Sequence, residues 1–225
     1  MAGRLSTPAI GHGVPGSVTI DTGQGIIAGD LTLPADPKGL VIFAHGSGSS
    51  RRSSRNRAVA ESMVQAKLGT LLLDLLTTAE EQIDTVTAEL RFDIPLLAKR
   101  VVSAIDWIAT QPPARVLPIG LFGASTGAAA ALLAAAERPA VVRAVVSRGG
   151  RPDLAGDGLR FVTAPTLLIV GGRDPQVLEL NRAALERLTC TRRLDIVPGA
   201  THLFEEPGTL EQVADLAIAW FRDHL

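Results

Sequence analysis

A serine within residues 120–127 is the side chain best placed to do chemistry. The stretch reads G-L-F-G-A-S-T-G, so Ser125 lies in the pattern G-x-S-x-G between an expected strand at 116–122 and an expected helix at 126–137. In that context the serine occupies a sharp turn that lifts its hydroxyl above the end of a sheet, where it can attack a carbonyl carbon. A serine that only caps the helix is the competing interpretation, and the pattern alone leaves both open.

A serine hydroxyl becomes a good nucleophile only when a neighbouring base removes its proton, and histidine is the usual base. The chain has four histidines. His12 lies near the N-terminus, His45 ends an expected strand, and His224 is the penultimate residue. His202 instead lies in a loop between the last expected strand and the last expected helix. That position favours His202 as the general base over a solvated surface histidine.

A catalytic imidazole needs a carboxylate that fixes its tautomer and stabilises the imidazolium. Asp174 lies just beyond the apolar strand expected at 166–170 and just before a helix, where its side chain can reach across the end of the sheet. Its alternative role is that of a helix N-cap, because Pro175 follows at the first helical position. Ser125, Asp174 and His202 each follow a successive strand, and this agreement favours a Ser-His-Asp triad.

The loop H-G-S-G-S-S at 45–50 supplies the donors that a tetrahedral oxyanion would need. Its glycines allow backbone N–H groups to turn toward the nucleophile. We assign the oxyanion hole to the amides of Ser47 and Thr126, with Gly48 as the substitute for Ser47. A flexible loop without a role is the alternative.

The elements that must position these residues alternate between apolar strands and segments of helical period, which is typical of an α/β protein with a mostly parallel sheet. Two short alternating runs at 17–21 and 25–33 predict a leading antiparallel hairpin. We expect about eight strands in one domain at 17–225, preceded by a flexible segment at 1–16. The polar stretch 77–91 has no clean period and is expected to be a surface loop or an irregular helix. The remaining strands and helices are expected at 39–44, 55–67, 70–76, 93–110, 142–147, 176–188, 193–197 and 210–224.

The connection from 147 to 166 is too short to hold a helical cap over the site, so we expect an open pocket without a cap domain. Arginines surround that pocket, and Arg51, Arg52 and Arg148 are candidates for gripping an acidic substrate, because a guanidinium binds a carboxylate through two parallel bonds. The alternative is that these charges form a solvated face.

Composition narrows the possible partners. The 225 residues are 46% hydrophobic and carry a net charge of −1, so no overall field draws the protein to nucleic acid or to an anionic membrane. Its single cysteine, Cys190, cannot form an internal disulfide, and no segment approaches the length of a membrane span. We expect a cytoplasmic protein that acts on a small molecule; its oligomeric state is left open.

The motifs H-G-S-G-S-S, G-A-S-T-G, G-G-R-D and G-A-T-H together resemble those of the α/β-hydrolase superfamily, in particular its dienelactone-hydrolase-like branch. The resemblance runs from residue 17 to the C-terminus. It implies Ser125 as the nucleophile, Asp174 as the acid and His202 as the base, with no metal or organic cofactor. Authentic dienelactone hydrolases use a cysteine nucleophile, whereas this chain has a serine at the turn.

These observations predict a serine hydrolase that cleaves a small carboxylic ester, lactone or thioester through an acyl-enzyme. An acyltransferase or a cofactor-free perhydrolase would use the same triad. A binding protein that keeps the fold without the chemistry is an alternative of a different class.

Overall fold

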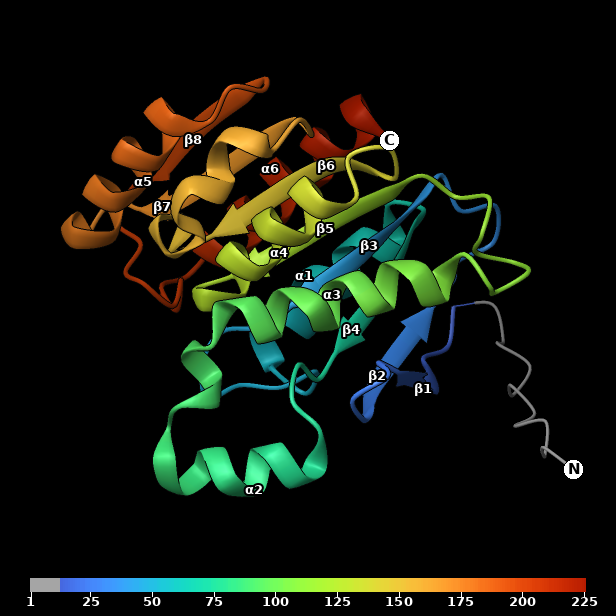
Figure 1. Cartoon of the computed structure of the whole chain (residues 1–225). Coiled ribbons are helices and arrows are strands. Elements are labelled where there is room, and N and C mark those ends of the chain that lie inside the picture. Colours follow the sequence, from blue (N-terminus) through green and yellow to red (C-terminus); the bar gives the residue numbers. More distant parts are fainter. Residues whose placement is uncertain (1–12) are drawn as a thin grey trace, which may run out of the picture.

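The structure, a computed structural model, describes residues 13–225 and is built on one eight-stranded sheet (Figure 1). The strand order is β1-β2-β4-β3-β5-β6-β7-β8. The β1–β2 and β2–β4 pairs are antiparallel and all the others are parallel. The predicted α/β class, the leading hairpin and the eight strands are therefore confirmed.

The strands are β1 (Gly16–Asp21), β2 (Ile26–Thr32), β3 (Gly39–Ala44), β4 (Leu68–Leu73), β5 (Ile119–Ala124), β6 (Val142–Arg148), β7 (Thr166–Gly171) and β8 (Arg192–Val197). The helices are α1 (Ser54–Gln65), α2 (Thr78–Thr87), α3 (Ile94–Ile108), α4 (Thr126–Glu137), α5 (Pro175–Arg187) and α6 (Thr209–His224), with 3₁₀ segments η1 (Leu90–Phe92) and η2 (Pro152–Phe161). Residues 1–12 of the predicted flexible segment lie outside the described residues, and Gly16 already belongs to β1.

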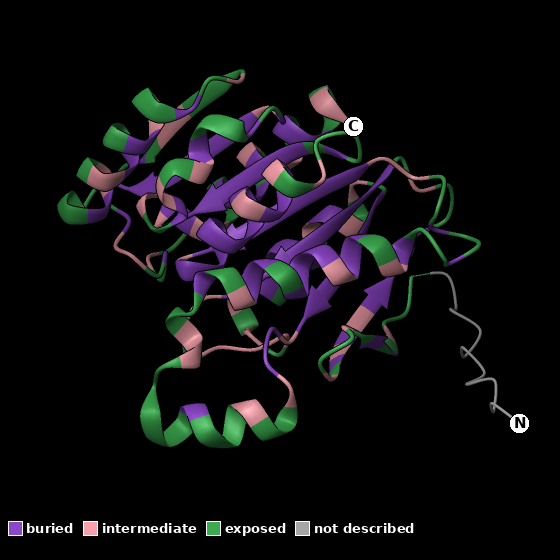
Figure 2. Cartoon of the chain, viewed as in Figure 1, coloured by how far each residue is buried: buried purple, intermediate pink, exposed green. Residues whose placement is uncertain are grey.

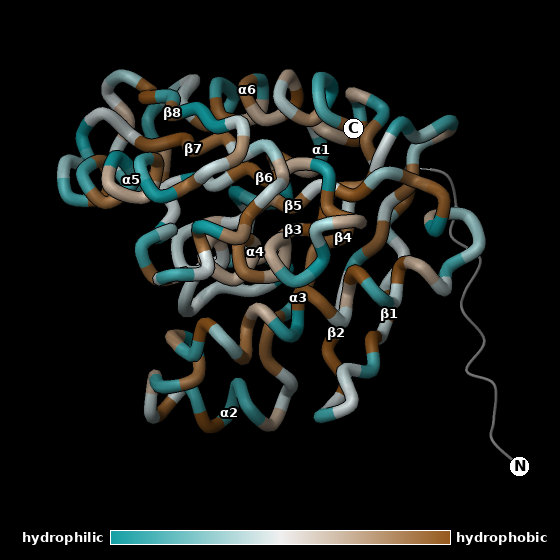
Figure 3. Tube along the Cα trace, turned by 45° about the horizontal axis from the view of Figure 1, so that its top comes forward, coloured by the Kyte–Doolittle hydropathy of each residue, from teal (hydrophilic) through white to brown (hydrophobic). Residues whose placement is uncertain are grey.

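Helices cover both faces of the sheet, which explains why its central strands are apolar throughout. The helices α3, α4 and α5 share one hydrophobic core with η2, while α1 and α6 form the second core on the opposite face. Figure 2 shows the central strands buried between these layers, and Figure 3 shows the same strands as hydrophobic. Parallel strands align their carboxyl ends, so the loops after β3, β5, β6, β7 and β8 meet at one edge of the sheet.

Small residues let α4 lie directly against the sheet at that edge. A methyl group on Gly123 would lie 2.4 Å from the Ala128 Cα, and one on Gly127 would lie 2.3 Å from the carbonyl oxygen of Ala44. Any side chain at these two positions would push β5, α4 and β3 apart. The glycines on either side of Ser125 are therefore required by close packing as well as by the turn itself.

The expectation of a loop or irregular helix at 77–91 is wrong in part, because α2 is a regular helix. Its N-terminus has a complete capping box, in which Thr77 Oγ1 accepts from the Glu80 N–H and Glu80 Oε2 accepts from the Thr77 N–H at 2.7 Å. Figure 1 shows α2 projecting from the body of the molecule. Most of its residues are exposed, so the apolar period that normally identifies a helix is weak.

No cap covers the carboxyl edge between β6 and β7, as expected for a connection of this length. The chain there forms η2, which breaks at Gly156 and packs against α4 and α5. No helix within residues 13–225 is long and apolar enough to cross a membrane.

Candidate active site

Ser125 lies in a strained turn at the carboxyl end of β5. Its φ of 49° and ψ of −122° are values that a residue other than glycine rarely adopts. Although Ser125 occupies the N-cap position of α4, its side chain makes no capping hydrogen bond. Helix capping therefore does not explain why a serine occupies this position, and its hydroxyl is not bound to the helix.

The loop after β3 lies against this serine. A methyl group on Gly46 would be 2.9 Å from Ser125 Cβ and 3.7 Å from Ser125 Oγ. On the other side, the Ser125 N–H donates to the Arg148 carbonyl oxygen at 3.3 Å, and the Arg151 N–H donates to the Ser125 carbonyl oxygen at 3.0 Å. Backbone contacts from two neighbouring segments therefore stabilise the strained conformation of this turn.

The structure brings Asp174 and His202 together, with 2.7 Å between Asp174 Oδ2 and His202 Nδ1. Asp174 stands at the N-cap of α5 but makes no side-chain cap hydrogen bond, so its carboxylate serves the histidine and not the helix. The loops after β7 and β8 pack closely together. A methyl group on Gly171 would lie 2.4 Å from the Ala200 carbonyl oxygen, and that oxygen accepts a hydrogen bond from the Arg173 N–H at 2.9 Å.

The Asp174 contact determines which nitrogen of His202 remains available. An ionised carboxylate only accepts hydrogen bonds, so Nδ1 carries the proton and Nε2 is left as the acceptor. The His202 side chain is 39% exposed, against 14% for Asp174. A methyl group on Gly149 would lie 3.7 Å from His202 Cε1, so the segment 148–151 bonds to the Ser125 backbone and passes close to the His202 ring.

The predicted oxyanion donors line one small cavity. Ser47, Gly48 and Thr126 all border a space of about 10 Å³, close to the volume that one water needs. Within residues 13–225, no hydrogen bond occupies the backbone N–H of Ser47 or of Thr126. These two amides can therefore donate to a charged oxygen that arrives between them.

His45 orients one of these donors, a role that its position after a strand did not indicate. Its Nε2 accepts from the Leu75 N–H at 3.1 Å, so Nδ1 is protonated and donates to the Gly46 carbonyl oxygen at 2.9 Å. The Ser49 N–H donates to the same oxygen. Because a trans peptide directs its C=O and N–H to opposite sides, fixing this carbonyl fixes the direction of the Ser47 N–H.

The His45 ring is buried, with 8% of the residue exposed. Burial lowers the pKa of His45 below its ordinary value of 6.5, although its hydrogen bond to Gly46 and the charges of Asp74 and Glu81 act in the opposite direction. The neutral ring is the form that its two hydrogen bonds require, since protonated Nε2 could not accept from Leu75.

Comparison with known proteins places this chain in a family. The model of the dienelactone hydrolase family matches residues 27–221. The chain belongs to the dienelactone hydrolase family. A crystal structure of a dienelactone hydrolase from Anabaena variabilis ATCC 29413 is 57% identical, with a TM-score of 0.92 over 94% of this chain and 98% of that chain. An α/β serine hydrolase without lid from Xanthomonas campestris, 19% identical with a TM-score of 0.75 over 95% and 96%, shares the fold.

A curated relative from Mycobacterium tuberculosis strain H37Rv has a name of a different kind, "Putative phosphoribosyl transferase". It is 60% identical over 208 residues, which make up 92% of this chain but 46% of the relative. The chain thus spans about half the length of the curated relatives it matches.

The three arginines expected near the pocket of this family member differ in their surroundings. Arg51 forms ion pairs with Asp30 and Asp74, and its backbone N–H also donates to Asp74. Its charge is already neutralised, so Arg51 is less available to a substrate than the sequence suggests. Arg52 is exposed, and Arg148 is buried beside Phe204.

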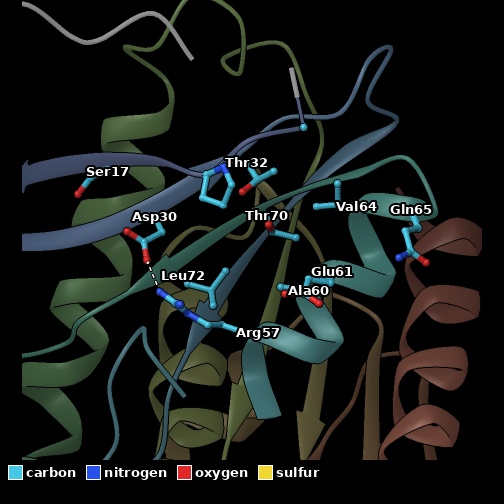
Figure 4. A pocket seen from close by; sticks show the side chains of 12 residues that line it. Ser17, Asp30, Thr32, Arg57, Ala60, Glu61, Val64, Gln65, Thr70 and Leu72 are labelled. Atoms are coloured by element: carbon cyan, nitrogen blue, oxygen red, sulfur yellow. Dashed lines mark hydrogen bonds and ion pairs between the residues drawn. The ribbon is translucent and has the colours of Figure 1, made fainter. Parts of the chain in front are cut away.

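A larger cavity lies elsewhere, in a groove between the β1–β2–β4 side of the sheet and α1 (Figure 4). Its volume is about 670 Å³, and Figure 4 shows the Asp30–Arg57 ion pair at its edge. None of the proposed triad or oxyanion residues lines it. Within residues 13–225, no cluster of three or more histidine, cysteine or acidic side chains is arranged to hold a metal ion.

Proposed function

We propose that this chain is a serine hydrolase that cleaves a small carboxylic ester, lactone or thioester through an acyl-enzyme. The observation that carries the proposal is that Ser125 and Asp174 both occupy N-cap positions without capping their helices, while Asp174 binds His202 Nδ1. Serine and aspartate ordinarily cap a helix at this position, but neither side chain does so here.

The proposed reaction assigns one role to each of these residues. Ser125 Oγ attacks the carbonyl carbon as His202 Nε2 removes the hydroxyl proton, and Asp174 stabilises the resulting imidazolium. The carbonyl oxygen becomes an oxyanion and accepts hydrogen bonds from the Ser47 and Thr126 amides, with the Gly48 amide as the alternative to Ser47. Collapse of the intermediate breaks the bond to the leaving group, which takes the proton from His202. A water molecule, deprotonated by His202, then attacks the acyl-enzyme and releases the acid and Ser125.

The open edge of the sheet favours hydrolysis over acyl transfer. The His202 side chain is more than one-third exposed, and η2 packs on α4 and α5 and forms no lid over the site. Water therefore reaches the acyl-enzyme freely. Dedicated acyl transfer would require the site to exclude water.

We assign hydrolysis, and not phosphoribosyl transfer, to this chain. The curated relatives that carry the transferase name are more than twice as long as the matched region, and 208 matched residues necessarily include positions 125–202. The three proposed catalytic positions of this chain therefore fall within the matched region, and we propose that the transferase name refers to an activity of the relatives' remaining length.

Labelling with a fluorophosphonate tests the proposal. The reagent phosphonylates a serine only when that serine is activated as a nucleophile, so intact mass should show one adduct on the wild-type protein and peptide mapping should place it on Ser125. Ser103→Ala, on the outer side of α3, is the control and should label normally. An unlabelled wild-type protein would leave a non-catalytic binding protein as the better description.

A further inference from the structure

The strand β8 forms one margin of the sheet. It pairs with β7 on one side, and no strand within residues 13–225 pairs with its other side (Figure 1). The β7–β8 register runs without a shift from Thr166 opposite Arg192 to Gly171 opposite Val197, and β8 contains no proline. An edge strand without a bulge or a proline is a template for pairing with another strand.

The hydrogen bonds to β7 show which backbone groups of β8 face outward. The carbonyl oxygens of Thr191 and Val197 accept from the β7 segment at 2.8 and 2.9 Å. Backbone N–H and C=O groups change sides with each residue of a strand, so every second residue between these two also faces β7. Arg192, Leu194 and Ile196 therefore direct their N–H and C=O groups toward the open edge.

The side chains of β8 form one charged row and one apolar row. Arg193 and Asp195 lie on the same face, with 2.8 Å between Nη2 and Oδ2, and their side chains are 46% and 23% exposed. The Arg193 guanidinium lies 5.2 Å from the centre of the Trp220 ring, on the α6 side. Leu194 and Ile196 lie on the opposite face, and Ile196 is 43% exposed.

An open groove of about 580 Å³ runs beside this edge, between β8 and α6. The described residues that line it include the carboxylates of Asp195 and Asp215 and the apolar side chains of Ile196 and Leu216, but no basic side chain. An occupant that matches this lining must therefore bring a positive charge together with apolar surface.

A second copy of β8 would bring both. When two copies of one strand pair about a two-fold axis, they run antiparallel and outward residues meet outward residues. An axis at Arg193 would place that arginine opposite its own copy, and an axis at Asp195 would do the same to the aspartate. Like charges directly opposite each other destabilise a strand pair. An axis at Leu194 instead places Arg193 opposite Asp195 of the second copy, twice, and pairs all the outward backbone groups.

We propose that two copies of this chain associate through β8, antiparallel and centred on Leu194, so that their sheets join into one. Leu194 then packs against its copy, and Ile196 packs against the aliphatic stem of Arg192. The carboxyl edges of the two sheets face opposite directions, so both candidate active sites stay open. The inference does not depend on the proposed hydrolase function, and its test requires no turnover.

Sedimentation velocity at protein concentrations from about 1 to 200 μM tests the association. We expect the wild-type protein to change from monomer to dimer with a Kd on the order of 10 μM, because a single strand pair buries a small interface. Hydrogen exchange should show that the outward amides of Arg192, Leu194 and Ile196 become protected as the concentration rises. A wild-type protein that is monomeric at 200 μM would refute the proposal.

Exchanging the charges tests the register. Arg193→Asp and Asp195→Arg should each raise the Kd at least about ten-fold, because like charges then face each other across the axis. The double variant Arg193→Asp/Asp195→Arg restores opposite charges and should bring the Kd back to within about three-fold of the wild type. Asp21→Arg is the matched control: it makes the same change in charge at the exposed end of β1, on the other margin of the sheet, and should dimerise as the wild type does.

Each remaining outcome decides the question. Single variants that dimerise as the wild type does would place the interface elsewhere, and dissociation of Asp21→Arg alone would place it at β1. Weakened single variants without recovery in the double variant would refute the register centred on Leu194. Circular dichroism checks that each variant is folded. Should a variant fail to fold, hydrogen exchange of the wild type decides, and amides of β8 whose protection does not depend on concentration would refute the pairing.

Discussion

The α2–α3 side of the molecule and the carboxyl ends of β5 to β8 use their polar side chains in opposite ways. Around α2, the fully buried Arg100 pairs with Glu80 and also donates to Thr22, and the buried Asp84 receives two bonds from Arg91. At the strand ends, Ser125 and Asp174 make no capping bonds to their helices, and Arg148 pairs with no carboxylate in the part of the chain that the structure describes.

This difference separates polar groups that stabilise the fold from polar groups that are available for catalysis or binding. A buried ion pair is destabilising to break, because the partner that remains is left charged and unsolvated. A group that makes no stabilising bond can be removed with little loss of stability, so its presence is better explained by function. The comparison predicts that substitutions at the strand ends change activity and that substitutions around α2 change stability.

The largest effect is expected for Ser125→Ala. Turnover of a p-nitrophenyl ester should fall about 10⁴- to 10⁶-fold, with the remainder supplied by the oxyanion donors. The melting temperature should stay within a few degrees of the wild type, because the hydroxyl makes no capping bond. Steady-state kinetics and thermal unfolding measure both, and a variant with more than a tenth of wild-type turnover would remove Ser125 from the mechanism.

Asp174→Asn should follow, with a loss of about 10³- to 10⁴-fold in kcat, because an amide permits the wrong tautomer of His202. The N-cap of α5 should be unaffected, since Asp174 makes no cap bond there and asparagine is itself a good N-cap. Circular dichroism and urea unfolding check the fold. A large loss of stability with preserved kcat would show that Asp174 belongs with the structural groups.

On the α2 side, Glu80→Ala should lower stability and leave activity unchanged, the reverse of the two preceding variants. Removing this carboxylate leaves Arg100 buried without its ionic partner and breaks the capping box, so the free energy of unfolding should fall by about 3 kcal/mol. Turnover per folded molecule should be unchanged. Glu80→Gln is the matched control: it can still accept from the Thr77 N–H and should cost less. A stable Glu80→Ala with impaired turnover would contradict the comparison.

The smallest effect concerns His45, which belongs to both classes because it holds the loop and orients a proposed donor. Its pKa is lowered by burial, so the unfolded state binds more protons than the folded state at mildly acidic pH, and stability should decline as pH falls below 6.5. Urea unfolding at pH 7.5, 6.5 and 5.5 should show this slope in the wild type. It should be shallower in His45→Gln.

His224→Gln at the C-terminus is the control and should keep the slope. Turnover of His45→Gln per folded molecule should also fall by roughly ten-fold, less than the loss of a whole oxyanion donor, since the Ser47 N–H remains but is no longer aimed. An unchanged slope with unchanged turnover would show that the Gly46 carbonyl is held well enough by Ser49 alone.

The helix α2 could have been identified from the sequence. The weak apolar period at 77–91 predicts a loop or an irregular helix, although Thr77 and Glu80 have the spacing of a capping box, a local signal that needs no tertiary contact. The helix α4, by contrast, was predicted with its observed bounds, because its alanines and the turn before it define both ends.

The sequence by itself determined the order of the strands and helices and the residues that follow each strand. These features depend on apolar period, turn residues and short motifs, which act over a few neighbouring positions. Since parallel strands place their carboxyl ends at one edge, the sequence predicts that Ser125, Asp174 and His202 lie at the same edge of the sheet.

Only the tertiary structure decided which polar groups are already satisfied. Arg51 is neutralised by Asp30 and Asp74, which lie 21 and 23 positions away, whereas within residues 13–225 the Arg148 side chain hydrogen-bonds only to Asn56, 92 positions away on α1. In the sequence the two arginines look alike. Their difference arises because the pairing and burial of a charge depend on which distant segments the fold brings beside it, and no local pattern records that.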